Sequence, residues 1–154
     1  MKIILVSIGK KHDNNIAALV QDYTLRLQKY FETSWAILPP AKKAIDQIQI
    51  KKEEAQTLLN FIQKDDYVIL LDEHGKILSS PETANKIRLV ADASYKRLLF
   101  VIGGAYGVNS IIKERANFTW SFSLLVFPHM LARCILVEQV YRACTILKNE
   151  KYHH

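Results

Sequence analysis

Residues that could do chemistry are concentrated in the last third of the chain. An apolar segment over 98–102, typical of a buried strand, runs directly into the turn Gly103-Gly104-Ala105-Tyr106-Gly107. Glycines at such a place let a ligand approach the backbone, because no Cβ blocks the main chain. A second aromatic and serine-containing stretch spans Phe122 to Phe127, and Pro128-His129 then opens a long apolar helix. Two open loops beside a residue that can transfer a proton predict the cofactor pocket of an enzyme.

Each of these motifs also has a purely structural interpretation. Gly103, Gly104 and Gly107 suit a tight turn between a strand and a helix, and on their own they favour that interpretation. The turn lacks the pattern of a dinucleotide or phosphate loop, which argues against hydrolysis of nucleoside triphosphates. His129 would feel the positive end of its helix, which favours the neutral imidazole. Proton transfer and a simple place at the helix start are about equally expected for it.

Further polar side chains follow on the same helix and after it. Arg133 lies one turn after the histidine, on the same helix face. Glu138 and Arg142 are four positions apart, and an intrahelical ion pair is the simpler interpretation of that spacing. Tyr152 and His153 stand where a frayed tail is usual. No group of His, Cys, Asp and Glu has the spacing of metal ligands, so we expect no metal.

Composition limits the class of protein. The chain has 154 residues, which is enough for one domain over residues 1–154. No apolar run approaches the roughly 18 residues of a membrane span. The apolar segment Ile3 to Ile8 is too short and interrupted for a signal peptide and is typical of a strand. We therefore expect a cytoplasmic protein that does not enter a membrane.

The net charge and the two cysteines say less about the class of protein. The net charge of +6 fits a solvated basic surface and a polyanionic partner about equally well. Cys134 and Cys144 lie ten positions apart on one expected helix, a separation of about 15 Å that excludes a disulfide between them. We expect both cysteines to be reduced core residues.

Strands and helices alternate along the chain, and the strands are almost wholly apolar. This pattern predicts an α/β domain with a mostly parallel sheet flanked by helices. Ligands of such sheets lie beyond the carboxyl ends of the strands, here after Leu71, after Ile102 and over Phe122 to Phe127. The expected strands are 3–8, 35–38, 67–71, 98–102 and 120–122. The first expected helix is capped by Asp13 or Asn14, and its buried stripe is Ile16, Leu19, Val20, Tyr23, Leu27 and Tyr30. The second has the apolar face Ile45, Ile48, Ala55, Leu58, Leu59 and Ile62. Three more helices are expected over 79–93, 111–116 and 128–147.

The last helix is apolar around most of its girth. Nearly every uncharged position from Met130 to Leu147 is hydrophobic. Such a helix must be covered on both sides. One side can lie on the sheet, and a second subunit would cover the other, so we expect a twofold homodimer.

Taken together, these motifs resemble the ribosomal RNA large-subunit methyltransferase H family. The resemblance covers the whole chain, including the opening strand that ends in Gly9-Lys10, and it is densest after Leu98. Each motif is short, but their order and spacing make a chance match improbable. The matching motifs are Phe100-Val101-Ile102-Gly103-Gly104-Ala105-Tyr106-Gly107, Trp120-Ser121-Phe122-Ser123, Phe127-Pro128-His129, Glu138-Gln139-Val140-Tyr141-Arg142-Ala143 and Tyr152-His153.

The resemblance implies a specific activity. Members of the family are bacterial SPOUT-class enzymes that methylate N3 of a pseudouridine in 23S ribosomal RNA of the assembled ribosome. The implied fold carries a C-terminal trefoil knot, although protein chains are in general unknotted. The implied cofactor is S-adenosylmethionine, and the implied active form is a homodimer.

The implied reaction suggests roles for several residues. His129, Tyr152 and His153 are candidates for proton transfer, and Arg133 and Arg142 are candidates for holding a phosphate or a developing negative charge. The tail is long enough to reach across a dimer interface, so the site could be shared between subunits. The expected cofactor-binding residues are Leu71, Gly103, Gly104, Gly107, Phe122, Ser123, Leu124, Leu125, Val126 and Phe127.

The chain departs from the family in one loop. Relatives can carry lysine or threonine between Ser123 and Phe127, where this chain has Leu124-Leu125-Val126. If main-chain groups hold the adenine edge, the change adds only apolar wall. If a side chain makes that contact, cofactor affinity is weaker here. We favour the main-chain interpretation.

Two alternatives stay open. The chain has no RNP aromatic pattern, KH loop or zinc knuckle, so we expect it to recognise the shape of the assembled ribosome rather than naked RNA. It could instead be a SPOUT methyltransferase of another RNA, such as a transfer RNA. It could also be a non-catalytic ribosome-associated protein with a vestigial pocket.

Overall fold

The molecule is built on one parallel sheet. The structure is a computed structural model that describes residues 1–42 and 46–152. Every strand pairing in that part of the chain is parallel, in the order β2-β1-β4-β3-β5. The predicted α/β architecture is therefore confirmed. The strands are β1 (Lys2–Ile8), β2 (Glu32–Leu38), β3 (Tyr67–Ile77), β4 (Arg97–Ile102) and β5 (Phe118–Ser121).

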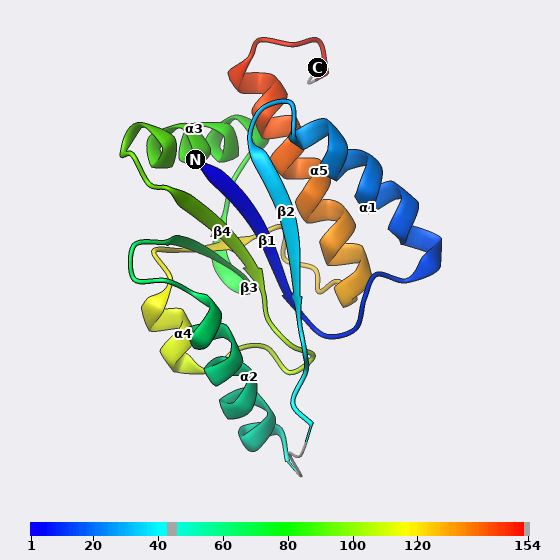
Figure 1. The fold of residues 1–154 in the computed structure, drawn as a ribbon, viewed down its shortest axis with the longest axis vertical. Coiled ribbons are helices and arrows are strands. Elements are labelled where there is room, and N and C mark those ends of the chain that lie inside the picture. Colours follow the sequence, from blue (N-terminus) through cyan, green and yellow to red (C-terminus); the bar gives the residue numbers. More distant parts are fainter. Residues whose placement is uncertain (43–45, 153–154) are drawn as a thin grey trace.

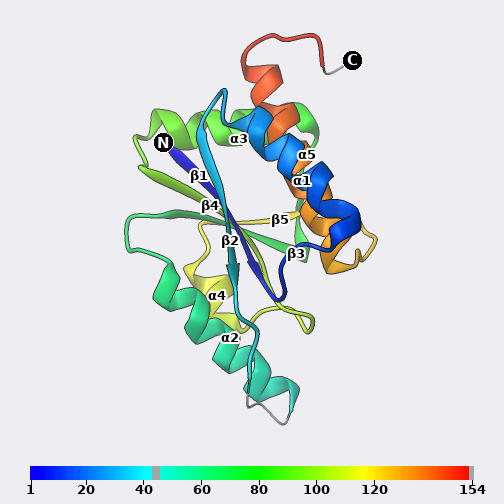
Figure 2. The same ribbon diagram turned by 45° about the vertical axis from the view of Figure 1, so that its right-hand side comes forward.

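Helices cover both faces of the sheet and create two apolar cores (Figures 1 and 2). Successive side chains of a strand point to opposite faces. In β4, Phe100 therefore enters the core beneath α1 (Asn14–Leu27), α3 (Ser80–Asp92) and α5 (His129–Leu147). Its neighbour Val101 enters the other core, beneath α2 (Gln47–Phe61) and α4 (Ser110–Arg115). Burial on both sides explains why the strand sequences are almost continuously apolar.

The first and third helices begin directly after their predicted N-cap residues. The Asp13 carboxylate accepts a hydrogen bond from the Asn15 N–H at 2.8 Å and caps α1. Ser79 and Glu82 form a reciprocal capping box before α3. Such caps occupy backbone N–H groups that a helix cannot pair internally. Pro128 precedes α5 and has no side chain able to form such a bond.

Three strand boundaries differ from prediction because tertiary pairing extends the strands. β2 begins three residues earlier, at Glu32, since it pairs with β1 along its whole length. β3 continues six residues past Leu71 to Ile77, across an irregularity, and Lys76 resumes the pairing with β5. β5 begins at Phe118, two residues earlier than predicted, and ends at Ser121.

Two residues predicted to be buried face solvent instead. Leu19 is 49% exposed and Ile48 is 80% exposed. Helix α1 packs through Val20, Thr24 and Leu27, which turns Leu19 outward. Helix α2 packs through its middle, and its first turn projects beyond the sheet. Ile45, predicted for the same apolar face, lies outside the described residues.

The chain itself covers most of α5. This helix lies on the sheet between α1 and α3, and eight of its residues are buried. Leu131, near its start, remains 48% exposed. The expected two-sided burial is thus largely met within one protomer, and the homodimer stays a prediction. Cys134 and Cys144 are buried free thiols, as expected.

None of the helices in the described ranges is both long and apolar enough to span a bilayer.

Substituting Gly75 by alanine should weaken the junction of β3 and β5. A Cβ on Gly75 would lie 2.7 Å from the Trp120 carbonyl carbon and 2.8 Å from the Thr119 carbonyl oxygen. Because both contacts are backbone, the strands must move apart, and we expect a loss of about 1–3 kcal/mol in the free energy of unfolding. Urea denaturation measures this loss. Lys76→Ala, at an exposed neighbour, should stay within about 0.5 kcal/mol of the parent; equal midpoints for all three proteins would contradict the close approach.

Candidate active site

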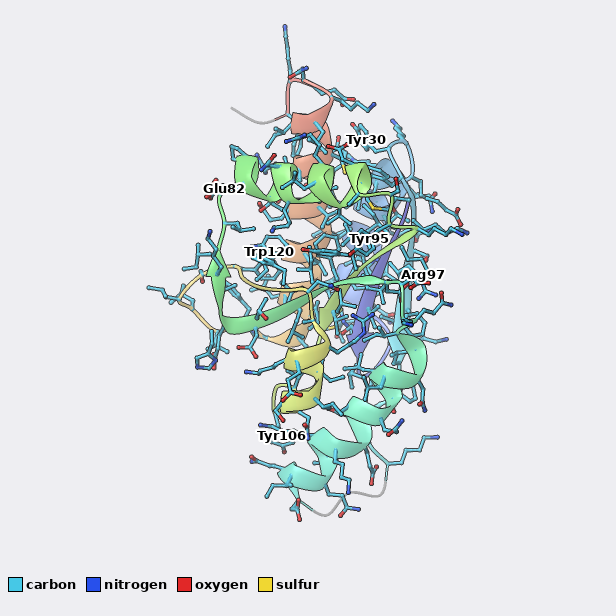
Figure 3. The ribbon with its side chains drawn as sticks, turned by 90° about the vertical axis from the view of Figure 1, so that its left-hand side faces the viewer. Tyr30, Glu82, Tyr95, Arg97, Tyr106 and Trp120 are labelled. Atoms are coloured by element: carbon cyan, nitrogen blue, oxygen red, sulfur yellow. The ribbon has the colours of Figure 1, made fainter. Side chains whose placement is uncertain are left out.

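A cavity of about 430 Å³ opens where β3, β4 and β5 end and α5 begins. Its volume is within the range of small-molecule sites. Figure 3 labels Tyr106 and Trp120 of its lining and, at the opposite end of β4, Arg97. The lining consists of Leu71, Asp72 and Glu73, the turn from Ile102 to Val108, the stretch from Trp120 to Ser123, the segment from Leu125 to Phe127, and His129 with Ala132.

Nine of the ten predicted cofactor residues line this cavity. They come from three segments that are far apart in sequence and meet at the carboxyl edge of the sheet. Leu124 is absent from the lining, and its side chain is 87% exposed. Its neighbours Leu125 and Val126 also keep most of their surface exposed, although both border the cavity. The loop thus presents apolar side chains outward.

The glycine turn has a shape that larger residues could not take. Gly107 has φ +78°, a conformation that L side chains rarely adopt, and its N–H donates to the Gly104 carbonyl at 3.0 Å. A Cβ on Gly104 would overlap the Glu54 carboxylate of α2. The turn therefore exposes main chain to the cavity on one side and leaves room for a carboxylate on the other.

The opposite wall is held by local hydrogen bonds. Ser121 Oγ donates to the Ser123 carbonyl at 2.7 Å, and Ser123 Oγ accepts from the Leu125 N–H at 2.9 Å. The Trp120 ring meets the Phe122 ring edge-on, with centroids 4.9 Å apart. The buried indole N–H of Trp120 has no hydrogen-bond acceptor among the described residues. Buried donors are nearly always paired, so a ligand acceptor would suit this group.

Acidic groups stand at the mouth of the cavity. Asp72 accepts from Lys113 Nζ at 2.8 Å and from the His74 backbone N–H at 3.0 Å. Burial acts to raise the pKa of the Asp72 carboxyl, but the hydrogen bonds from Lys113 and His74 outweigh it and lower that pKa. Asp72 is therefore a neutralised carboxylate that ties β3 to α4.

His129 lies at the cavity wall, as the first residue of α5. Its Nδ1 is buried and has no partner in the described part of the chain. The residue therefore borders the cavity, while this ring nitrogen is covered by protein. The proton-transfer role of His129 stays a prediction.

Arg133 lies away from the cavity. It is 1% exposed, and its Nε donates to Ser7 Oγ at 3.0 Å while its Nη1 donates to the Lys10 carbonyl at 2.9 Å. These contacts join α5 to the end of β1. Burial lowers the pKa of the Arg133 guanidinium. In this arrangement Arg133 fixes the start of α5 and has no surface for a phosphate.

Tyr152 is docked rather than frayed. Its hydroxyl donates to Glu138 Oε1 at 3.0 Å and lies 3.1 Å from the Tyr23 hydroxyl. Glu138 also forms the predicted ion pair with Arg142 at 2.6 Å. Burial, together with these hydrogen bonds, raises the pKa of the Tyr152 hydroxyl. His153 lies outside the described residues.

Tyr152 and the cavity are at different ends of α5. Glu138 is nine residues beyond His129 in that helix, about 13 Å along its axis at 1.5 Å per residue. In Figure 1 the tail lies beyond the far end of α5, away from the loops at the carboxyl ends of the strands. Within one protomer, the structure therefore does not bring Tyr152 to His129.

Several cavity residues were missed by reasoning from sequence. Trp120 and Ser121 belong to a quoted motif, and Asp72 and Glu73 follow a strand end that was singled out, so position alone could have found them. Glu54, which lies behind Gly104 and outside the cavity lining, gave no signal, because one glutamate in a lysine-rich helix is typical of a solvated face. Within residues 1–42 and 46–152, no group of His, Cys, Asp and Glu could hold a metal ion.

Comparison with known proteins gives concordant results over the full length. The family described as "Predicted SPOUT methyltransferase" matches residues 1–153. "Ribosomal RNA large subunit methyltransferase H" of Christiangramia forsetii is 42% identical over 156 positions, covering 100% of this chain and 99% of that protein. The protein of the same name from Flavobacterium johnsoniae is 38% identical with the same coverage. The one from Desulfitobacterium hafniense is 35% identical, covering 99% of each chain.

The Asp72 contacts predict a pH-dependent contribution to stability. A carboxylate whose folded-state pKa is lowered stabilises the fold above its unfolded-state pKa, and this contribution is lost as the pH falls through the folded-state value. Asp72→Asn should therefore unfold at lower urea than the parent at pH 7, and the difference should shrink below the ordinary pKa of 3.8. Glu73→Gln, at an exposed neighbour, should show little change at either pH. A deficit of Asp72→Asn that persists undiminished at pH 3 would contradict the assignment.

Proposed function

The chain belongs to the SPOUT methyltransferase family, and we propose that it transfers a methyl group from S-adenosylmethionine to N3 of a pseudouridine in 23S ribosomal RNA. The observation that carries this proposal is the cavity at the carboxyl ends of β3, β4 and β5, lined by the glycine turn. Full-length similarity to proteins named ribosomal RNA large subunit methyltransferase H supports the substrate.

The cavity suits S-adenosylmethionine. Bare main chain at Gly103 and Gly104 allows close approach, as an adenine edge held by backbone groups requires. Asp72 and Glu73 of the cavity lining offer acceptors for a ligand. The three segments over 71–73, 102–108 and 121–127 would hold the cofactor, which when bound supplies an activated sulfonium methyl group.

The protein's own task is alignment and proton control. Holding donor and acceptor in line contributes strongly to rate, because it replaces a chance encounter. Pseudouridine N3 carries a proton that must leave as the new bond forms. His129 at the cavity wall, and His153 of the tail, are the proposed groups for this proton. The raised pKa of Tyr152 keeps it a phenol, whose hydroxyl donates to Glu138 and thereby positions the tail.

A homodimer would bring the tail to the site. Tyr152 is bonded to Glu138, whose position in α5 lies about 13 Å along the axis from His129 of the same chain, so the two residues do not meet at one substrate atom there. We therefore assign Tyr152 and His153 to the partner's cavity, across a twofold interface. Arg133 is proposed to act indirectly, by fixing the start of α5 that carries His129.

Fold and substrate recognition complete the proposal. The C-terminal segment, from the wall loop through α5, forms the trefoil knot of the SPOUT class. The enzyme works in the cytoplasm, where ribosomes are assembled. With a net charge of +6, and no recognised RNA-binding module, it reads the shape of the assembled ribosome.

Methyl transfer to ribosomes tests the activity. Ribosomes from cells that lack this gene should accept one tritiated methyl group per large subunit from S-adenosylmethionine, whereas free ribosomal RNA should accept far less. Nucleoside mass spectrometry should identify N3-methylpseudouridine.

Ribosomes from cells that carry the gene are the control, because their site is already methylated. A methylated transfer RNA would establish the alternative SPOUT activity. Binding to ribosomes without any uptake of S-adenosylmethionine in calorimetry would establish the non-catalytic alternative.

Mixed dimers test whether the site is shared. One variant blocks the cavity (Ala105→Trp, at an exposed lining residue), and the other disables the tail (Tyr152→Phe with His153→Ala). Each should be inactive alone. Mixed after brief denaturation, half of the dimers pair one of each, and each such dimer has one intact site, so activity should return to about a quarter of the parent's.

Refolding either variant alone is the control. If the tail acts in its own chain's cavity, no mixed dimer has an intact site, and activity does not return.

A further inference from the structure

One buried carboxylate has no part in the mechanism above. Glu54 points inward from α2, is 6% exposed, and has its Oε2 buried without a hydrogen-bond donor among the described residues. The carboxylate lies directly behind Gly104, where a Cβ would overlap it. Gly104 also lines the cavity, so this residue borders both the cavity and the separate recess that holds the carboxylate.

Within the described part of the chain, no lysine or arginine forms an ion pair with this carboxylate. Burial raises its pKa, against a smaller lowering by the main chain at Ala41 and by His129. Lys51 lines the same small recess but forms no ion pair with it. A buried carboxylate with an unmet oxygen destabilises a fold, so its presence calls for a compensating use.

The other acidic groups of the cavity differ from Glu54. Asp72 is neutralised by Lys113, and Glu73 is exposed to solvent, where water and salt screen its charge. The Glu54 carboxylate lies in a mostly apolar recess with Ala55, Leu58 and Ile112, which Lys51 and Asn109 also line. Charges in such surroundings act over longer distances than exposed ones. Glu54 is therefore the carboxylate best able to influence a charged ligand.

We propose that Glu54 is a specificity-determining residue that makes the cavity favour the sulfonium-bearing methyl donor over its neutral thioether product. This inference rests on the proposed function, since it needs S-adenosylmethionine in the cavity. Methyl transfer breaks the S–C bond and forms the N–C bond, the N3 proton leaves, and the positive charge on sulfur disappears. In its ionised form, Glu54 behind the turn thus stabilises the donor complex and not the product complex, which helps the product leave.

Calorimetry on the full chain tests the proposal with three ligands. These are S-adenosylmethionine, S-adenosylhomocysteine, and sinefungin, which carries a protonated amine in place of the sulfonium. Glu54→Gln keeps the shape and one acceptor oxygen but removes the charge. It should weaken both cationic ligands about tenfold, as expected for loss of one nearby charge at an effective dielectric of about 20, and change the homocysteine affinity less than about twofold.

Glu53→Gln is the matched control, because it removes the same charge from the neighbouring position of α2, where the carboxylate pairs with Gln49. It should leave all three affinities within about twofold of the parent. An equal weakening of all three ligands by Glu54→Gln would mean that Glu54 only shapes the turn, and unchanged affinities would mean that its charge is not felt. Either result overturns the inference while the proposed function stands. If the parent binds none of the ligands, both fail.

Thermal stability supplies an independent readout. An acid whose folded-state pKa is raised destabilises the fold at neutral pH, and that penalty disappears as the pH falls below the unfolded-state value. Glu54→Gln should therefore melt no lower than the parent at pH 7, and its relative advantage should vanish near pH 4. A purely structural carboxylate would give the reverse, a lower melting temperature at pH 7 together with a uniform loss of affinity.

Discussion

The register of three parallel strands determines where the site lies. Leu71 of β3 pairs with Ile102 of β4 on one side and with Trp120 of β5 on the other. The three strands are therefore level at these residues, although the residues are about 30 and 20 positions apart in sequence. Each continues into a segment of the cavity wall. Because parallel strands all present their carboxyl ends at the same edge, loops from distant parts of a chain converge there without specific contacts between them. A change that shifts β5, such as a side chain at Gly75, would move one wall relative to the other two.

Local sequence patterns predicted the parts of the fold that local physics decides. Asp13 and Ser79 mark helix starts because their side chains bond nearby backbone N–H groups, and the apolar runs mark strands buried on both faces. Predicted element boundaries that depend on contacts with distant parts of the chain were wrong. The continuation of β3 to Ile77 depends on pairing with β5, and the exposure of Ile48 depends on how far α2 extends past the sheet. In the site, the glycine turn and the wall loop were predicted by residue type. Glu54 could not be, since only the fold shows that it lies behind Gly104.

Helix α5 shows how one sequence pattern can have two causes. Its apolar girth was taken to require a second subunit, but α1 and α3 of the same chain cover most of it. The pattern alone therefore no longer argues for a dimer. The separation of Tyr152 from His129 along this helix argues for one more directly. A tail held about 13 Å from the nearest proton-transfer candidate must either leave its own helix or serve another chain. Its contacts with Glu138 and Tyr23 would be lost in the first case and kept in the second.

Arg133 and Glu54 are buried on opposite faces of the sheet, and they differ in whether their hydrogen bonds are satisfied. Arg133 is fully buried, yet Ser7 and the Lys10 carbonyl accept its hydrogen bonds, so its burial fixes α5 against β1. Glu54 is nearly as buried, but one of its oxygens has no donor. Removing Arg133 would leave acceptors unmet and weaken the fold, whereas neutralising Glu54 would relieve a strained position. A group that destabilises the empty protein persists only where something else gains from it. The nearest beneficiary is a cation on the other side of Gly104, and this makes the glycine turn an electrostatic element of the site as well as a steric one.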